Sequence, residues 1–528
     1  MGVLSRFKAA ESEPHVVGTD APTDADDPAG RMHRRQQVPL MGSPQQQRIF
    51  DWFATTVQSQ PNLVVRARAG TGKTTTIIEG IRRAPESNIL LSAFNKRIAD
   101  ELNSRLSNPN AQAKTLHALG FAAVRENRQK VRVLSGSERA DALTRAAFGR
   151  ADVPKDIFRL VSMLHTKVRE LRPIGASTEV IEEVAYQFNF IPDEAWGKLW
   201  TLERVVAVAK AAVAQAAHEP SFTGGGIDFA DMIFLPLVNA GWLRPTYDLV
   251  VIDEAQDMSD SQLLMCQRVA RGRLAVVGDD RQAIYGFRGA DSTALDRMKR
   301  KLGALELPLT VTYRCGHSIV ERAQRLVPDI TAAPDNPQGT VNTVSFDAMM
   351  ALVQPGDFVL SRLNAPLVAV TLNLLAQRKR AFMLGRDVGQ GVLSVIKQLK
   401  LFKGASCDEL LTAIDEWARK RTTKLAARGM VDLADRARDQ ADMIRALAAT
   451  ALDADDVAAQ CNLLFQDLTS GDAVMCSSVH KAKGLETERV WVLMDTLYRR
   501  GTSLEEENIH YVAVTRAKSE LNLVTARV

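Results

Sequence analysis

The sequence predicts an α/β protein in which parallel sheets are flanked by helices, and three segments lead to this prediction. Short apolar runs that are typical of buried strands occupy residues 63–65, 249–252 and 274–277. Strands that are apolar along their whole length are characteristic of parallel sheets covered by helices on both faces. Asp253 directly follows the second run and Gly278 the third, and a glycine-containing segment follows the first. Because ligands of parallel α/β sheets bind where the strands end, we expect a ligand site at that edge.

Composition indicates a soluble globular protein with several domains. The chain has 528 residues, of which 46% are hydrophobic and 24% charged. No apolar run of about 18 residues and no signal-peptide pattern is present, so we expect no membrane contact and a cytoplasmic location, with a nuclear one left open. The five cysteines are scattered, which favours reduced thiols over disulfides or zinc. The net charge of +5 is compatible with a polyanionic partner without specifying one.

The first apolar run leads into a phosphate-binding loop. Residues 67–74 fit the pattern G-x-x-x-x-G-K-[ST], with Ala67 in the place of the first glycine. Small residues let backbone N–H groups surround phosphate oxygens, and the N-terminus of the following helix favours anions. We expect Lys73 to reach the β- and γ-phosphates and the Thr74 hydroxyl to bind Mg²⁺. A chance glycine-rich turn is the alternative, which the strand–loop–helix order disfavours. The residues expected to hold the nucleotide here are Ala67, Ala69, Gly70, Thr71, Gly72, Lys73, Thr74 and Thr75.

The next two apolar runs supply candidate catalytic groups. Asp253 and Glu254 follow residues 249–252 in the segment YDLVVIDEAQD. Carboxylates at a strand end suit Mg²⁺ binding, here by Asp253, and polarisation of an attacking water. A surface acidic pair that caps a helix is the alternative. Gln282 follows the third run, where its amide could sense the γ-phosphate.

Aromatic and polar residues are also expected at the edge where these strands end. Phe94 and Asn95 follow an apolar run at residues 88–93, and His117 follows a similar arrangement. Residues 285–288 interleave aromatic and cationic groups, which is what base stacking and phosphate contact require, although core packing is an alternative for Phe287. The candidate contacts to a nucleic-acid strand are Phe94, Asn95, His117, Tyr285, Phe287 and Arg288.

Together these segments resemble the motifs of the UvrD-like helicases of superfamily 1, in the order of that family. The matching segments are AxAGTGKT at 67–74, DEAQD at 253–257, GDDRQAIYGFRGA at 278–290, LTVTYR at 309–314, SVHKAKGLE at 478–486 and YVAVTRA at 511–517. The wording of AFNKRIADEL at 93–102 and of IYGFRGA at 284–290 is closest to the F-box DNA helicases and to small phage and bacterial members.

The resemblance implies an ATP-hydrolysing DNA helicase that needs Mg²⁺, moves along single-stranded DNA from 3′ to 5′ and separates duplex DNA in repair, recombination or replication. Gln46 matches the residue that reads adenine, Tyr313 the one that stacks on the base, and Glu486 the one that contacts the ribose. Arg314 and Arg516 match the two arginines that contact the γ-phosphate from a second motor domain. The catalytic set implied is Lys73, Asp253, Glu254, Gln282, Arg314 and Arg516. Phe287 stands where many members carry Trp, so stacking there is expected to be weaker.

The family fold would be two RecA-like motor domains with helical insertions. Residues 39–118 and 227–310 would form the first motor, and residues 311–387 and 471–528 the second. Residues 119–226 and 388–470 would be helical insertions, and residues 1–38 a disordered tail. The second insertion, at roughly 80 residues, is short for this family, a departure that would change how this insertion handles duplex DNA. Its basic run at 419–424 is a solvated helix face or a duplex contact.

Three alternatives stay open at this point. A short second insertion also suits a translocase that displaces proteins from single strands and unwinds little. A non-catalytic DNA-binding or recruitment protein is a second alternative, against which the complete set of catalytic residues argues. RNA could replace DNA, because backbone contacts and stacking discriminate poorly between the sugars. We expect a monomer or weak oligomer, and the sequence identifies no protein partner.

Overall fold

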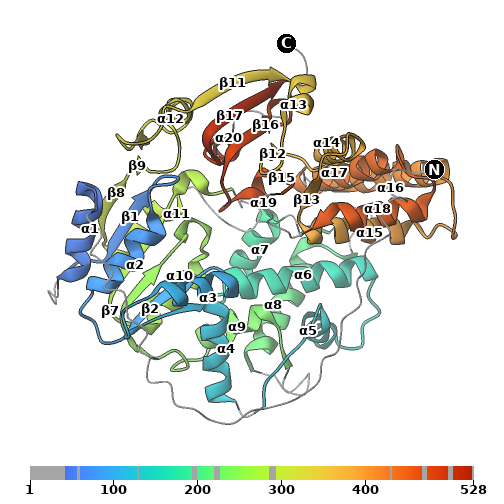
Figure 1. The fold of residues 1–528 in the computed structure, drawn as a ribbon. Helices are drawn as coiled ribbons and strands as arrows, with labels where there is room; N and C mark the ends of the chain where they lie inside the picture. Colours follow the sequence, from blue (N-terminus) through green and yellow to red (C-terminus); the bar gives the residue numbers. More distant parts are fainter. Residues whose placement is uncertain are drawn as a thin grey trace, which may run out of the picture.

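The computed structural model describes residues 42–55, 60–128, 130–188, 190–192, 199–218, 226–284, 293–427, 431–466, 472–497 and 503–525. Two parallel sheets, each with helices on both faces, dominate it (Figure 1). The α/β fold class predicted from the apolar runs is therefore confirmed. The predicted tail lies outside the described residues.

The first sheet has the strand order β3-β2-β6-β7-β1-β8. Its strands are β1 (Leu63–Ala67), β2 (Ile89–Ala93), β3 (Ala111–Thr115), β6 (Tyr247–Ile252), β7 (Ala270–Gly278) and β8 (Leu305–Leu309). The helices around it are α1 (Pro44–Ala54), α2 (Lys73–Arg83), α3 (Lys96–Arg105), α4 (Leu116–Asn127), α9 (Phe229–Val238), α10 (Asp260–Val269) and α11 (Ala294–Leu302). Sheet and helices together are called the first lobe below.

Successive residues of these strands face opposite sides of the sheet, as period-two geometry requires. Leu249 and Val251 belong to the core under α1 to α3, whereas Val250 and Ile252 belong to the core under α4, α9, α10 and α11. Both cores need apolar side chains, which explains why residues 249–252 are all apolar. The cores on both faces of the sheet therefore hold the edge at which β1, β6 and β7 end in place.

The second sheet has the order β11-β17-β16-β12-β15-β13-β14. Its strands are β11 (Thr340–Ser345), β12 (Phe358–Ser361), β13 (Ala381–Leu384), β14 (Phe465–Gln466), β15 (Val474–Ser478), β16 (Thr487–Leu493) and β17 (Ala517–Thr525). Its covering helices are α12 (His317–Gln324), α13 (Phe346–Leu352), α14 (Ala365–Ala376), α19 (Val479–Ala482) and α20 (Leu504–Val514). These elements, with the two-stranded sheet of β9 (Val311–Thr312) and β10 (Thr331–Ala332), are called the second lobe.

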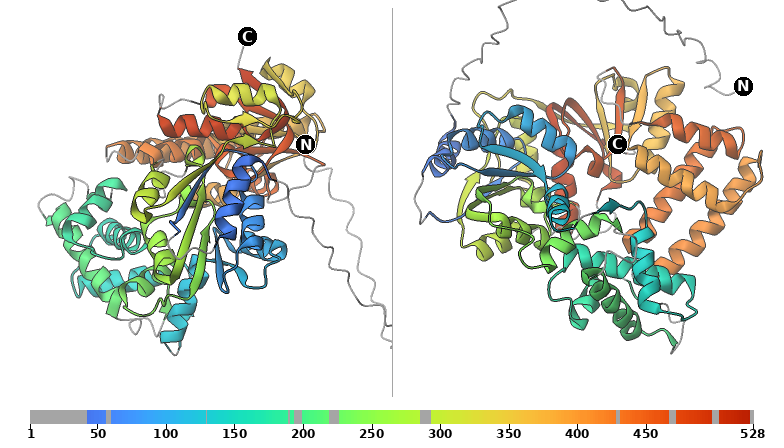
Figure 2. Two further views of the ribbon diagram at one scale, coloured as in Figure 1. Left: turned by 90° about the vertical axis from the view of Figure 1, so that its left-hand side faces the viewer. Right: turned by 90° about the horizontal axis from the view of Figure 1, so that it is seen from below.

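Each lobe carries a helical insertion (Figure 2). The first consists of α5 (Glu138–Phe148), α6 (Lys155–Leu171), α7 (Thr178–Gln187) and α8 (Leu202–His218), with the strand pair β4 (Arg132–Val133) and β5 (Gly226–Ile227) at its base. The second consists of α15 (Arg386–Leu399), α16 (Cys407–Ala426), α17 (Val431–Ala448) and α18 (Ala454–Leu464). The range 388–470 was expected to be helical throughout, but β14 at its end pairs with β13 because buried Phe465 packs into the core of the second lobe. The predicted domain boundaries remain predictions.

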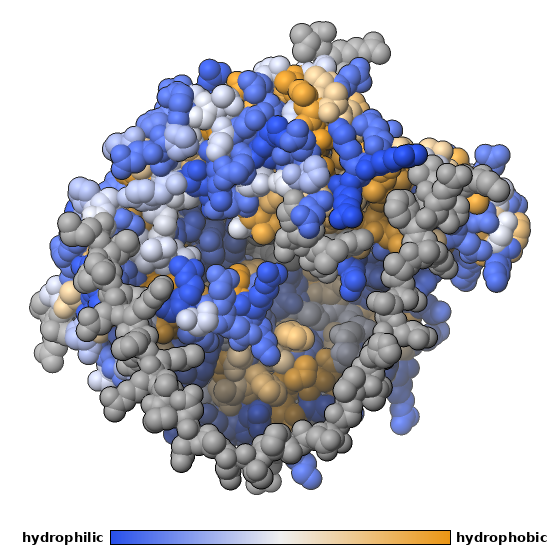
Figure 3. Space-filling view, in the orientation of Figure 1, coloured by the Kyte–Doolittle hydropathy of each residue, from blue (hydrophilic) through white to orange (hydrophobic). Residues whose placement is uncertain are grey.

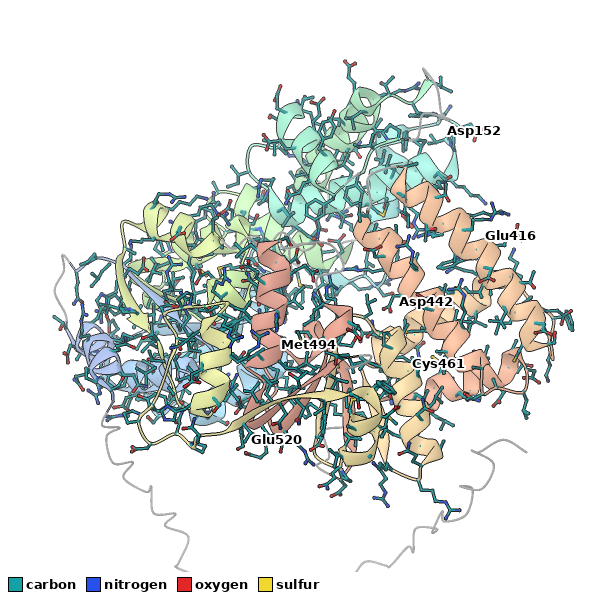
Figure 4. All side chains as sticks on the ribbon, turned by 90° about the horizontal axis from the view of Figure 1, so that it is seen from above. Asp152, Glu416, Asp442, Cys461, Met494 and Glu520 are labelled. Carbon is teal, nitrogen blue, oxygen red and sulfur yellow. The ribbon has the colours of Figure 1, made fainter. Side chains whose placement is uncertain are left out.

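The two insertions lie side by side, with Asp152 on one and Glu416 on the other (Figure 4). Phe190 packs against a small core formed by Leu425, Ala434 and Ala437. At its edge Lys424 Nζ lies 3.3 Å from a carboxylate oxygen of Asp156. Lys424 belongs to the basic run for which a duplex contact and a solvated face were both open, and here it forms an ion pair between the insertions. Among the described residues, no helix is long and apolar enough to cross a membrane.

A buried ionic cluster anchors the first insertion to α9. Asp231, which is fully buried, accepts hydrogen bonds from Arg139 Nε at 2.9 Å and Arg169 Nη1 at 2.6 Å. Arg169 is also paired with Asp228, the residue that caps α9. Charges that are buried in this way are stable only while each keeps its hydrogen-bonded partners.

Asp231→Asn is expected to destabilise the protein by about 3 kcal/mol, because two buried guanidiniums lose the carboxylate that they share. Urea unfolding followed by tryptophan fluorescence measures this. The control is Asp248→Asn, which removes a partly exposed partner of Arg271 and should cost ~0–1 kcal/mol. Equal stability of the two variants would contradict the structural role assigned to the cluster.

Candidate nucleotide and strand site

The phosphate-binding loop lies between the two lobes. It leaves β1 at Ala67 and enters α2 at Lys73, and Gly70 and Gly72 have φ values of +72° and +76°. The backbone N–H of Tyr313 donates a 2.9 Å hydrogen bond to the carbonyl oxygen of Gly70. A Cβ on Gly70 would lie 2.5 Å from the Cβ of Arg314. Glycine is therefore required here both by the left-handed φ and by the approach of the second lobe.

The candidate catalytic carboxylates meet the loop at the end of β6. The Thr74 hydroxyl donates to Asp253 Oδ2 at 3.4 Å, and Lys73 Nζ lies 3.8 Å from Glu254 Oε1. Burial and the adjacent Glu254 raise the pKa of Asp253 to about 6. Burial alone would raise the pKa of Glu254, but Lys73 and Lys483 outweigh it and hold that pKa near 2. A hydroxyl and a carboxylate beside a lysine-bearing phosphate loop fit a Mg²⁺–triphosphate group.

Gln282 is held close to these groups in the short 3₁₀ helix after β7 (Asp280–Gln282). Its Nε2 donates to Asp279 Oδ2 at 2.7 Å, and its backbone oxygen accepts from Lys483 Nζ at 2.8 Å. Lys483 also contacts Asp257 at 2.6 Å. A lysine of the second lobe is thus bonded to the segment that carries Asp253 and Glu254 and to the one that carries Gln282.

Both candidate arginines lie on the side of the second lobe that faces the loop. Arg314 is paired with Glu486 and donates to the backbone oxygen of Thr515 at 3.2 Å. The three hydrogen bonds of the Arg516 side chain, at 2.9–3.2 Å, all go to neutral oxygens, which belong to Val512, Leu485 and Thr515. Burial, followed by nearby Arg314, lowers the pKa of Arg516 to about 9. A buried guanidinium whose partners are neutral is suited to an incoming anion.

Gln46, Tyr313 and Glu486 form the outer part of the site. The Tyr313 ring is about half exposed at 49%, and its hydroxyl lies 3.5 Å from Gln46 Oε1. Gln46 is buried, and its amide is already bonded to the Ser43 backbone N–H and the Thr76 hydroxyl. Reading of adenine by Gln46 would therefore require a change in these bonds. Glu486 also lies 3.6 Å from Lys518.

Two candidate strand contacts line a cavity of about 400 Å³ next to the carboxylates. Phe94 is 52% exposed, and His117 packs edge-on against Phe229. Asp253 and Glu254 line the same cavity, so strand and nucleotide sites would adjoin. The face drawn in Figure 3 is largely hydrophilic and is hollowed in its lower half, where hydrophobic side chains gather.

The remaining strand contacts are only partly described by the structure. The Asn95 side chain is exposed and caps α3 by accepting from the backbone N–H of Ile98. Tyr285, Phe287 and Arg288 lie outside the described residues.

Sequence reasoning missed several residues that connect these groups. Tyr511 accepts a 3.0 Å hydrogen bond from the backbone N–H of Ala69, and Gln256 Nε2 donates to Glu254 at 2.5 Å. Arg68 occupies a variable position of the loop pattern and forms several ion pairs. The sequence contained one indication of these ion pairs. Arg68 directly follows β1 and lies between Ala67 and Ala69, and a charge that is buried in such surroundings requires partners.

Two family models match this chain. Residues 51–303 match the model of the UvrD/REP helicase N-terminal domain, and residues 473–524 match that of the UvrD-like helicase C-terminal domain. The chain thus belongs to the UvrD-like helicases of superfamily 1, as the motif order predicted.

Individual relatives point the same way. The F-box DNA helicase protein 1 of Schizosaccharomyces pombe is 26% identical over 87% of this chain and 55% of its own length. DNA helicase IV of Escherichia coli is 26% identical over 51% of this chain and 46% of its own. DNA helicase II of the same organism is 23% identical over 50% and 38%. The chain therefore spans about half the length of these curated relatives or less.

Gly70→Ala is expected to abolish nucleotide binding, because the added methyl group would meet both the left-handed φ and the second lobe. Binding of a fluorescent ATP analogue measures this. The matched control is Gly303→Ala, where φ is +55° and nothing lies within 4 Å of the added Cβ. It carries similar backbone strain of roughly 1–2 kcal/mol without the contact. If both variants lose binding, backbone strain alone accounts for the effect, and the contact with the second lobe is not needed to explain it.

Proposed function

We propose that the protein is an ATP-dependent DNA helicase that moves along single-stranded DNA from 3′ to 5′ and unwinds duplex DNA. The observation that carries the proposal is the meeting of Lys73, Asp253 and Glu254 from the first lobe with Arg314 from the second, all around a glycine-containing loop. Phosphoryl transfer needs positioning and charge neutralisation from several directions, which a site between two lobes supplies.

Each residue has a role that its surroundings allow. Lys73 and the N–H groups of the loop would hold the phosphates, and Thr74 and Asp253 would hold Mg²⁺, which neutralises phosphate charge when bound. Glu254, with a lowered pKa, is ionised and can orient a water molecule and accept its proton. Arg314 and Arg516 would stabilise charge on the γ-phosphate, and Gln282 would sense that group.

Coupling to movement follows from the adjoining strand cavity. Asp253 and Glu254 share a cavity with Phe94 and His117, so a shift of the lobes around the nucleotide would reach the strand contacts. Alternating closure and opening would change the distance between two groups of strand contacts, and the protein would thereby move along the strand.

A translocase that displaces proteins and unwinds little is the second candidate. The contact between the two insertions favours it, because Phe190 and Asp156 of the first insertion already cover part of the small second one. Displacement of a strand and displacement of a bound protein, measured side by side on the same substrates, distinguish the two activities.

Lys73→Ala is expected to lower strand-stimulated ATP hydrolysis at least a hundredfold, since the β- and γ-phosphates lose their cation. A coupled ATPase assay with and without single-stranded DNA measures this. Turnover close to wild type would refute the site, and wild-type turnover that ignores DNA would refute the motor. Unwinding of duplexes with 3′ or 5′ tails, in DNA and RNA versions, tests polarity and substrate.

Phe94→Ala is expected to raise the concentration of single-stranded DNA that half-saturates the ATPase about tenfold, as the loss of a base stack of ~1–3 kcal/mol implies. The rate without DNA should stay the same. Phe402→Ala is the matched control, because Phe402 is similarly exposed at 63% but lies in the second insertion. An unchanged DNA dependence in the Phe94 variant would exclude that contact.

A further inference from the structure

Arg68, the second residue of the phosphate-binding loop, is surrounded by three aspartates. Its side chain is 8% exposed. Nη1 lies 3.2 Å from Asp279 and 2.7 Å from Asp280, whereas Nε and Nη2 each donate at 2.8 Å to the two oxygens of Asp329. The proposed roles of the loop in phosphate binding do not use this side chain.

The three aspartates belong to different lobes. Asp279 and Asp280 directly follow β7 of the first lobe. Asp329 lies between α12 and β10, and its neighbours Val327 and Ile330 are buried in the core of the second lobe. The bidentate Arg68–Asp329 pair therefore connects the loop across the boundary between the lobes.

The same arginine is linked to the candidate γ-phosphate sensor. Asp279 accepts from Arg68 with Oδ1 and from Gln282 Nε2 with Oδ2. The Asp279 backbone N–H donates at 3.0 Å to Gln256, whose amide contacts Glu254. A hydrogen-bonded chain thus runs from Asp329 in the second lobe to two candidate catalytic side chains in the first.

The two sides of Arg68 differ in exposure. The Asp279 side chain is fully buried and that of Asp280 is 17% exposed, whereas 49% of the Asp329 side chain is exposed. Separation of a buried charge from its partner is costly, but a partly exposed carboxylate can exchange an arginine for water at little cost. Arg68 should therefore remain with the first lobe when the lobes separate, and Asp329 is the partner that leaves.

We propose that Arg68 is a positioning residue whose pair with Asp329 forms a latch between the lobes. The latch favours the arrangement in which the second lobe lies against the loop, and it fixes Asp279, and through it Gln282, in that arrangement. The proposal rests on the proposed function in one respect, namely that the lobes close around a nucleotide. When the latch is lost, nucleotide binding has to supply the free energy of closure.

The test uses Asp329→Asn, which keeps Arg68 with its buried partners. The distance between the lobes is followed by single-molecule fluorescence transfer between dyes on unnatural amino acids at exposed positions 101 and 347, without nucleotide. We expect a larger distance in the variant. The KM for ATP should rise up to about fivefold, the upper end for a partly exposed ion pair, and kcat should change less than KM.

Asp248→Asn is the matched control, because it removes another bidentate arginine partner that lies within the first lobe. It should change neither the distance nor KM. Arg68→Lys keeps a positive charge for Asp279 and Asp280 but not the bidentate geometry, so its effect should not add to that of Asp329→Asn.

An interlobe distance in Asp329→Asn equal to that of the wild type would overturn the proposal, and additive effects of the two substitutions would do so as well. The distance measurement needs no nucleotide, so it decides the latch even if the wild type proves unable to hydrolyse ATP. Failure of the proposed function is thereby distinguished from failure of the latch.

Discussion

The contact between the phosphate-binding loop and the second lobe is the constraint on which the rest of the structure depends. Gly70 accepts a hydrogen bond from Tyr313, and Ala69 donates one to Tyr511. Ala69 is also buried within the core of the second lobe. Because the loop has almost no side chains at these points, two sheets can approach its backbone while leaving N–H groups for phosphate oxygens.

This contact determines from which lobe each charged group of the site comes. Cations reach the loop from both lobes, whereas the carboxylates that would polarise water come from the end of β6. Lys73 and Lys483 together keep Glu254 ionised, while burial beside Glu254 makes Asp253 easier to protonate. A cation bound between Thr74 and Asp253 would favour the ionised form of Asp253. The charges of the site are thus complementary to a metal–phosphate group.

Much of this arrangement could be predicted because it depends on local pattern. The apolar runs of β1, β6 and β7 and the pattern at 67–74 specify strand, loop and helix with little influence from the rest of the chain. The links between the lobes could not be predicted, because they join residues distant in sequence, such as Arg68 and Asp329. Gln46 shows a second limit. The resemblance implied that Gln46 and Tyr313 contact the same base, but it did not indicate the bonds that the Gln46 amide forms with Ser43 and Thr76.

The pairs that join the lobes differ in what a separation would cost. Lys483 is bound to Asp257, and both side chains are at most 10% exposed, so their separation would leave charges in a poorly solvated place. Arg281 and Glu507 form a more exposed pair, at 17% and 39%. Water can replace partners in pairs of the second kind with a small change in free energy. Opening between the lobes should therefore begin at the more exposed pairs, those of Glu507 and Asp329. The buried pair of Lys483 and Asp257 should separate last.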